Sequence, residues 1–308
     1  MDKRFWLYVL KRFLLGILTI FVVATITFWV MQLVPGGPFL SEKATPQYVL
    51  DELNALYGLD KPVFIQYLNY LKGIVVFNFG FSLKQRGRTV MDIILSGLKV
   101  SAPIGLIAMV LALFFGVIFG SWAALRQNKF ADRMIMLFTT TCVAMPSFVI
   151  ATMLLLIFCV LLPWFPANGQ SAAGYILPTL TLSLLPMANI TRFVRTTTVE
   201  TLKQDFIVTA TAKGLPRRTV LFKHGLRNSI TPVITYAGPM FAFIITGSLV
   251  VEQVFTISGL GSSFVNSITS RDYPLIMGTT VFITELMVVV LFISDLLYSW
   301  VDPRVKFE

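Results

Sequence analysis

Long uncharged apolar runs limit what this chain can fold into more than any other feature. A helix needs about 20 mostly apolar residues to cross the roughly 30 Å hydrocarbon layer of a membrane. Such runs occupy residues 13–33, 100–125, 134–191 and 228–251, and a further apolar run at 274–299 counts as a span despite Glu285 and Asp295 inside it. The run 134–191 is too long for one crossing, and the turn-rich PWFPANGQSAAG divides it, so we count it as two spans. We therefore predict an all-α integral membrane protein with six transmembrane helices.

Composition agrees with this class, because 56% of the residues are hydrophobic and only 13% are charged. The expected spans are residues 13–33, 100–125, 134–162, 175–194, 228–251 and 274–299. Lys and Arg near the membrane favour the cytoplasmic side. With the N-terminus inside, the cytoplasmic segments hold 17 of the 25 Lys and Arg residues, so we expect both termini to be cytoplasmic.

The segment 34–99 is the one sizeable insertion outside the membrane, between the first and second spans, and we expect it to be extracytoplasmic. Thr45 and Pro46 predict a helix start there and Gly58 predicts its end. A second helix is expected at 62–72, with Gly73 after it. The domain organisation is then a cytoplasmic N-terminus at 1–12, the first span, this helical insertion, and a membrane core at 100–308 that includes a cytoplasmic loop at 195–227.

Several kinds of chemistry have no support in the sequence. His224 is the only histidine, so a zinc site with paired histidines cannot be built. The phosphate-binding pattern G-x-x-x-x-G-K-[ST] is missing, so we expect the chain to bind no ATP by itself. No nucleic-acid motif is present, and topology together with anionic lipid accounts for the net charge of +10. We predict no catalytic residue, no metal and no bound cofactor.

Glu285 is the least expected residue, because a carboxylate near the centre of a span costs several kcal/mol unless it has a partner or a wet cavity. It has two interpretations, a protonated or hydrogen-bonded contact between helices and a place along a translocation path. Glu252 and Asp295 lie nearer the ends of their spans, where a solvated or interfacial position is expected.

The loop at 195–227 is basic and carries helix signals. Residues 200–213 have helical spacing, with Leu202, Phe206 and Ala210 on one stripe and Gly214 placed to end the helix. Pro216 suits the first turn of a second short helix, which carries Val220, Leu221 and Leu226. Apolar residues in a cytoplasmic hairpin predict a surface that docks into a groove of a partner. A basic loop with no partner is the alternative.

This loop resembles the conserved cytoplasmic loop of ABC importer permeases, whose general form is E-A-A-x-x-x-G followed by I-x-L-P. DFIVTATAKGL and HGLRNSITP fit the version of the peptide-importer branch, apart from Thr211 in place of arginine. The likeness extends over nearly the whole chain, through KRFLLGILTIFVVATITFWVMQLVPGGPF, FNFGFSLKQRGRTVMDII, GSLVVEQVFTISGLGSSFVNSITSRDYPLIMG and DLLYSWVDPRVKF. In the G-L-G stretch, Ser258 stands where proline is usual. The chain is most similar to the B-type permease subunits of oligopeptide importers.

The resemblance implies a type I ABC importer permease of the bacterial inner membrane. Such a subunit pairs with a homologous C-type permease, docks on two ATPase subunits that use ATP and Mg, and receives peptide from an extracytoplasmic binding protein. The coupling loop would be the element that meets the ATPases. Its implied residues are Asp205, Thr209, Ala210, Ala212, Lys213, Gly214, Leu215, His224, Leu226 and Arg227.

Other functions remain open at this point. A dipeptide, nickel-chelate or glutathione importer has nearly the same signature as an oligopeptide importer. A secondary transporter that uses Glu285 as an ion or proton site would work without ATPase partners. An intramembrane enzyme lacks a convincing catalytic cluster.

Overall fold

The computed structural model describes residues 3–35, 58–169, 171–216, 219–220, 225 and 227–301. Over these residues the chain is mostly helical. The helices that form the body of the molecule are α1 (Lys3–Leu33), α4 (Val90–Leu125), α5 (Phe130–Ala144), α7 (Ile176–Thr201), α10 (Arg227–Ile245) and α13 (Tyr273–Val301). The shorter elements are α3 (Val63–Val75), α6 (Ser147–Leu155), η1 (Leu156–Leu161), η2 (Ala172–Tyr175), α8 (Asp205–Ala212), α11 (Leu249–Val254) and α12 (Leu260–Thr269).

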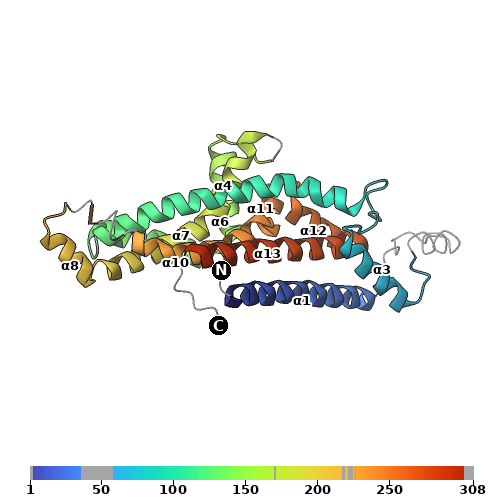
Figure 1. Cartoon of the computed structure of the whole chain (residues 1–308). Coiled ribbons are helices and arrows are strands. Elements are labelled where there is room, and N and C mark those ends of the chain that lie inside the picture. Colours follow the sequence, from blue (N-terminus) through green and yellow to red (C-terminus); the bar gives the residue numbers. More distant parts are fainter. Residues whose placement is uncertain are drawn as a thin grey trace.

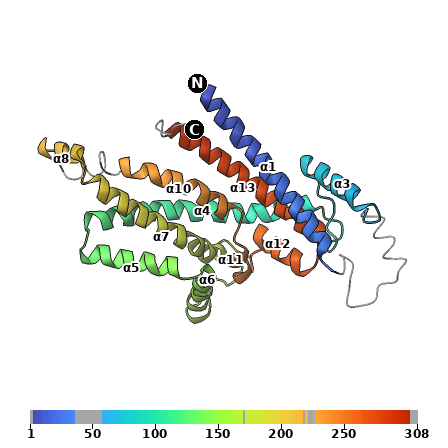
Figure 2. The ribbon, with the colours of Figure 1, turned by 90° about the horizontal axis from the view of Figure 1, so that it is seen from below.

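The long helices form an elongated bundle (Figure 1), in which α1 and α13 cross α4 and α5 obliquely (Figure 2). The short helix α8 projects at one end of this bundle, and α3 lies near the other end. Helix α1 packs along α13, on the far side of the bundle from α5 (Figure 2). We call the two ends of the bundle the α8 end and the α3 end, after the short helix that lies at each.

Five described helices are long and apolar enough to cross a membrane, and a sixth crossing is counted if the bent pair formed by Phe130–Ala144 and Ser147–Leu161 is one span. This agrees with the expected all-α membrane architecture. The last span was expected at residues 274–299, and α13 covers it almost residue for residue.

The most extensive contact between helices joins α4 and α7. A Cβ added at Gly116 would meet Ile190, and one added at Gly120 would meet Val194, both at 2.7 Å. Only glycine therefore allows this approach. Because the contacts advance in the same direction along both helices, α4 and α7 run parallel in a close seam toward the α8 end.

The third expected span, 134–162, is not one straight helix. Helix α5 ends at Ala144, and α6 begins at Ser147 with its axis turned by 104°. Met145 has extended backbone angles, as expected for the residue before a proline, and Pro146 starts the new helix. The bend therefore follows from Pro146, which the apolar pattern alone did not reveal.

The fifth expected span, 228–251, is also interrupted. Helix α10 ends at Ile245 and α11 begins at Leu249, capped by the Ser248 hydroxyl that accepts from the Val251 N–H. Gly247 lies between them with a φ of 87°, in the left-handed region that side chains rarely adopt. The chain then turns back through α12 before entering α13.

The insertion after the first span is described only from Gly58 onward, so the helix predicted from Thr45 lies outside the described residues. Gly58 has a φ of 67°, which suits its expected place after a helix. Helix α3 begins at Val63 as predicted but runs through Gly73 to Val75. The following segment is held to the start of α13 by buried Asp272, which accepts hydrogen bonds from the Ser82 hydroxyl and from the Leu83 N–H at 3.1 Å.

Candidate functional site

Helix α8 is short but closed at its C-terminal end. Asp205 lies in its first turn, where a negative charge complements the helix dipole. At its end the Gly214 N–H donates to the Thr211 carbonyl at 3.0 Å, and the Leu215 N–H donates to the Ala210 carbonyl at 3.4 Å. With Gly214 at a φ of 77°, this is a Schellman motif. The prediction that Gly214 ends the helix is confirmed.

Helix α8 has one face packed against its own loop. Ile207, Ala210 and Val220 form a small buried cluster, with Leu202 packed beside it. The expected helix 200–213 is interrupted after Thr201, and the break turns α8 so that Ile207 faces inward. The predicted stripe is therefore wrong at Phe206, which is 43% exposed. The small size of Ala210 serves packing inside the loop.

The rest of α8 is exposed. Phe206 and Val208, on either side of Ile207, and Leu215, just beyond the end of the helix, are exposed large apolar side chains, and α8 itself lies at the end of the bundle (Figure 1). Asp205, Thr209, Ala212 and Lys213 are exposed beside them. The structure thus brings the predicted residues from Asp205 to Leu215 together on one short capped helix. His224 and Leu226 lie outside the described residues, as does the side chain of Arg227.

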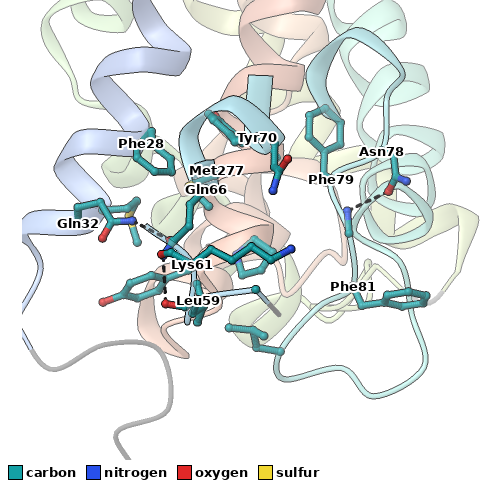
Figure 3. A pocket seen from close by; sticks show the side chains of 18 residues that line it. Phe28, Gln32, Leu59, Lys61, Gln66, Tyr70, Asn78, Phe79, Phe81 and Met277 are labelled. Atoms are coloured by element: carbon teal, nitrogen blue, oxygen red, sulfur yellow. Dashed lines mark hydrogen bonds between the residues drawn. The ribbon is translucent and has the colours of Figure 1, made fainter. Parts of the chain in front are cut away.

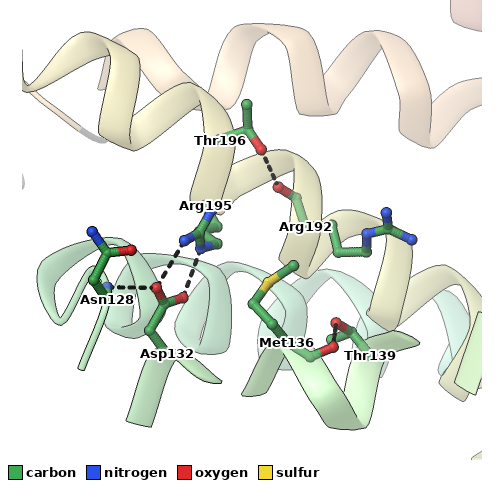
Figure 4. Close-up of polar contacts among 7 residues, drawn as sticks. All are labelled: Asn128, Asp132, Met136, Thr139, Arg192, Arg195 and Thr196. Carbon is green, nitrogen blue, oxygen red and sulfur yellow. Dashed lines mark hydrogen bonds and ion pairs between the residues drawn. The ribbon is translucent and has the colours of Figure 1, made fainter. Parts of the chain in front are cut away.

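An ion pair fixes the part of α7 that leads to this loop (Figure 4). Arg195 donates from Nε and from a terminal nitrogen to the two carboxylate oxygens of Asp132, at 2.6 and 2.7 Å. Asp132 is buried and also accepts from the Asn128 N–H at 2.8 Å. A bidentate pair of this kind fixes the relative orientation of the two side chains as well as the distance between them. It holds the start of α5 against α7.

The break between α10 and α11 borders a cavity of about 480 Å³, which we call the central cavity. Helices α7, α10 and α13 form its walls, and most of its lining is apolar. Hydroxyl groups supply its polar atoms, and none of its described lining residues is charged. The hydroxyl residues are Ser147, Thr181, Thr246, Ser248, Thr280 and Thr284.

Most of these hydroxyls already donate within their own helices. Thr181 donates to the Leu177 carbonyl at 2.8 Å, and Thr284 donates to the Thr280 carbonyl at 2.8 Å. A hydroxyl that has used its hydrogen in this way keeps lone pairs that accept. The central cavity therefore offers neutral acceptors to a guest that carries N–H donors.

Sequence reasoning missed the role of Glu252. It was expected in a solvated or interfacial position, but it is only 3% exposed. Its carboxylate accepts from the Ser101 hydroxyl at 2.6 Å and from the Ser262 N–H at 2.9 Å. A Cβ at Gly247 would lie 2.6 Å from the same carboxylate. Glu252 thus joins α4, α11 and α12 directly behind the helix break.

Glu285 lies on a different face of α13 from the central cavity. Val281 packs with Ala24 of α1 and Ile74 of α3, and Glu285 follows one turn later. One of its carboxylate oxygens is buried without a hydrogen-bond partner among the described residues. Burial raises the pKa of the Tyr70 phenol on α3, and the nearby charge of Glu285 raises it further. The role of Glu285 along a translocation path stays a prediction.

A second cavity, of about 400 Å³, lies at the α3 end and is called the α3 cavity (Figure 3). Phe28 and Gln32 reach it from α1, Tyr70 from α3, and Met277 from α13. Gln66 of α3 donates to the carbonyl of Lys61 at 2.8 Å and closes one side. Glu285 is not among the residues that line either cavity.

Comparison with known proteins identifies the family. Residues 116–307 match the family model of the binding-protein-dependent transport system inner membrane component, and residues 5–91 match the model of the N-terminal part of such membrane components. The dipeptide transport system permease protein DppB of Bacillus subtilis is 44% identical over 300 residues, covering 97% of each chain. The oligopeptide transport system permease protein OppB of Salmonella typhimurium is 41% identical over 303 residues, covering 97% of this chain and 99% of its own.

A solved structure shares the fold. The crystal structure of an amino acid ABC transporter with histidines superposes with a TM-score of 0.52 at 16% identity, covering 70% of this chain and 95% of the other. At this identity the likeness concerns the fold alone. The family models and the relatives together cover nearly the whole sequence. The chain therefore belongs to the family of binding-protein-dependent transport system inner membrane components, as a B-type permease of the peptide ABC transporters.

Proposed function

We propose that this chain forms one half of the translocation path of an ATP-driven oligopeptide importer and couples that path to cytoplasmic ATPase subunits. The observation that carries the proposal is α8. A closed helix whose inner face is packed within its own loop, and which exposes Phe206 and Val208 on its flanks and Leu215 just beyond its end, is suited to dock as a rigid body into a groove.

A movement of α8 would be transmitted directly to the membrane helices. The chain leads from α7 into α8, the Arg195–Asp132 pair connects α7 to α5, and the close contact at Gly116 and Gly120 connects α7 to α4. ATP-driven closure of the partner ATPases would shift these helices together and alternate the access of the path. This chain itself binds no cofactor in the proposed mechanism, because ATP and Mg act in the partner subunits.

The central cavity is the part of the path that this chain contributes. A peptide main chain carries N–H donors at every residue except proline. Neutral hydroxyl acceptors among apolar walls bind such a chain without requiring a particular side chain or charge. This chemistry favours peptides over charged metal chelates.

The remaining assignments follow from the same proposal. The α8 end faces the cytoplasm together with both termini, and the α3 end faces outward, where a binding protein delivers peptide. The membrane is the bacterial inner membrane, and the second half of the path is a homologous C-type permease. Oligopeptides are the proposed substrate, and dipeptides are the nearest alternative because relatives at similar identity carry either name.

The test is purification of the tagged chain in mild detergent, followed by mass spectrometry and an ATPase assay. We expect a second permease and ATP-hydrolysing subunits to co-purify, and the reconstituted complex to take up peptides when ATP is supplied inside. Recovery of this chain alone, in a form that transports with an ion gradient and without ATP, would support the secondary transporter and overturn the proposal.

A further inference from the structure

The turn that leads into α4 is closed by its own backbone. We call residues 82–89 the basic turn. At its base the Ser82 N–H donates to the Arg88 carbonyl at 3.1 Å, and nearer its tip the Arg88 N–H donates to the Gln85 carbonyl at 3.2 Å. The two hydrogen bonds bring both strands of the turn together and leave its tip pointing away from them.

A buried carboxylate ties the basic turn to the bundle. Asp272, directly before α13, is only 1% exposed and accepts from the Ser82 hydroxyl. It also accepts from the N–H groups of Leu83 at 3.1 Å and Lys84 at 3.4 Å. Removing a buried carboxylate from several donors is costly, because each donor then lacks its partner. The basic turn is therefore a preformed surface in a fixed position.

The basic turn presents positive charge to solvent. Lys84 and Arg86 are exposed on it, and Arg271 is exposed beside the anchoring Asp272. None of these three cations forms an ion pair within the part of the chain that the structure describes. Clustered cations without counter-charges on a fixed surface attract an acidic partner.

The length of α4 places the basic turn beyond the lipid headgroups. Helix α4 has 36 residues and is about 54 Å long, whereas the hydrocarbon layer is about 30 Å thick. Its charge-free stretch is 100–125, between Lys99 and Arg126, so the layer lies there. The ten helical residues before Val100 rise about 15 Å, or about 11 Å at a tilt of 40°. The headgroup region on each side is only about 5 to 8 Å thick, so the basic turn stands in water.

An exposed aromatic ring lies at the base of the basic turn. Phe81 pairs with Thr89 in an isolated antiparallel bridge and is 55% exposed. Since Thr89 is the residue that caps the start of α4, this ring also lies beyond the headgroups. Arginine and aromatic side chains together are typical of protein–protein interfaces. The surface therefore fits a soluble protein with an acidic patch.

We propose that the basic turn is a docking contact for the extracytoplasmic peptide-binding protein, whose acidic side chains pair with Lys84, Arg86 and Arg271. The inference rests on the proposed function, because it takes its partner from there. The ATPase subunits are excluded, since they meet α8 at the opposite end of the bundle. Because Asp272 holds the basic turn to the start of α13, the docked protein contacts an element that also walls the central cavity.

The first experiment is site-specific cross-linking in the complete importer, in its own membrane and with the binding protein present. The photoreactive residue p-benzoyl-phenylalanine replaces Gln85, which is exposed on the basic turn. Gln127 is the matched control, because it is an exposed glutamine in the turn after α4, at the other end of the same helix. Illumination should join this chain to the binding protein from position 85 and not from position 127, as identified by mass spectrometry.

The second experiment reverses one charge. Arg86→Glu should raise about tenfold the concentration of binding protein that half-saturates ATP-driven peptide uptake at low salt. Uptake at saturating binding protein should stay within about twofold, whereas a variant that only lost stability would lower it.

The matched variant is Lys72→Glu, the same charge change on an exposed residue of α3 outside the basic turn, which should shift half-saturation less than about twofold. Added salt should weaken docking of the unaltered importer more than docking of Arg86→Glu, because salt screens exposed charges.

Lipid adducts instead of the binding protein at position 85, or equal half-saturation for Arg86→Glu and Lys72→Glu, would overturn the docking contact and leave the proposed function standing. Cross-links from position 85 to the second permease alone would show that the partner is wrong. If the unaltered chain transported peptide without ATP and without any binding protein, the proposed function itself would fail.

Discussion

Glu252 shows how much of this fold depends on single buried polar groups. Its carboxylate accepts from a hydroxyl on α4 and from the backbone of α12, while Gly247 leaves room for it beside the helix break. Nothing in the local sequence predicts this arrangement, because Ser101 lies 151 positions away along the chain. A carboxylate near the end of an apolar run is typical of an interface with water, and only tertiary packing makes this one buried.

The first prediction concerns this carboxylate. Glu252→Ala should destabilise the chain by about 3 kcal/mol, because the Ser101 hydroxyl and the Ser262 N–H lose their acceptor in a buried place. Thermal unfolding of the purified complex should show it. The control is Gln253→Ala, which removes only an exposed contact with Asn266 and should cost less than about 0.5 kcal/mol. Equal midpoint temperatures of unfolding for the two variants would contradict the role given to Glu252.

The second prediction concerns Glu285. Glu285→Gln should leave peptide uptake within about twofold of the unaltered importer, because the side chain lies toward α1 and α3 and lines neither cavity. Glutamine keeps the shape and removes the charge. Uptake of labelled peptide, normalised to the amount of assembled complex, is the measurement. Lost uptake with intact assembly would place Glu285 on the path after all.

At the level of single elements, helix ends were easier to predict than helix breaks. Gly214 was placed correctly from sequence, because glycine after a helix has a local conformational reason. The breaks at Pro146 and Gly247 were missed, since both lie inside uncharged apolar runs, and the serines beside them, Ser147 and Ser248, are also compatible with an unbroken span. The inward turn of α8 was also missed, because the contact of Ile207 with Val220 depends on the chain folding back.

The third prediction belongs to α8. Gly214→Val should lower ATP-driven uptake by about tenfold or more, because a β-branched residue cannot adopt its φ of 77° without strain and the Schellman motif opens. The matched variant is Gly214→Asn, because asparagine tolerates this conformation and should keep most uptake. Membrane insertion, measured by protease protection, should be equal for both. If the valine variant transports normally, α8 does not couple ATP hydrolysis to transport.

At the scale of the whole molecule, the fold class and the approximate positions of the spans could be predicted because each needs only a long apolar run. The helical body of residues 227–301 shows the limit of that reasoning, since α10, α11, α12 and α13 fold back on one another around the central cavity. Apolarity places these segments in the membrane, but it does not say that the span 228–251 is broken at Gly247 or that hydroxyl groups from several of these segments line one cavity.

The fourth prediction tests that cavity. Thr284→Trp should fill part of the central cavity and lower peptide uptake about tenfold or more, while the complex still assembles and hydrolyses ATP. Thr284→Val is the control, because it keeps the volume and removes only the hydroxyl, so its uptake should fall by less than about threefold. Equal uptake by both variants would mean that peptide travels by another route.

The close seam between α4 and α7 also has a consequence for which substitutions this sequence tolerates. At Gly116 the nearest atom to an added Cβ belongs to the Ile190 side chain, so a smaller residue at position 190 would make room for alanine. At Gly120 an added Cβ would meet the Thr191 carbonyl oxygen at 2.7 Å, and no substitution removes a backbone atom. Gly120 is therefore the position that can change only if α7 as a whole moves away.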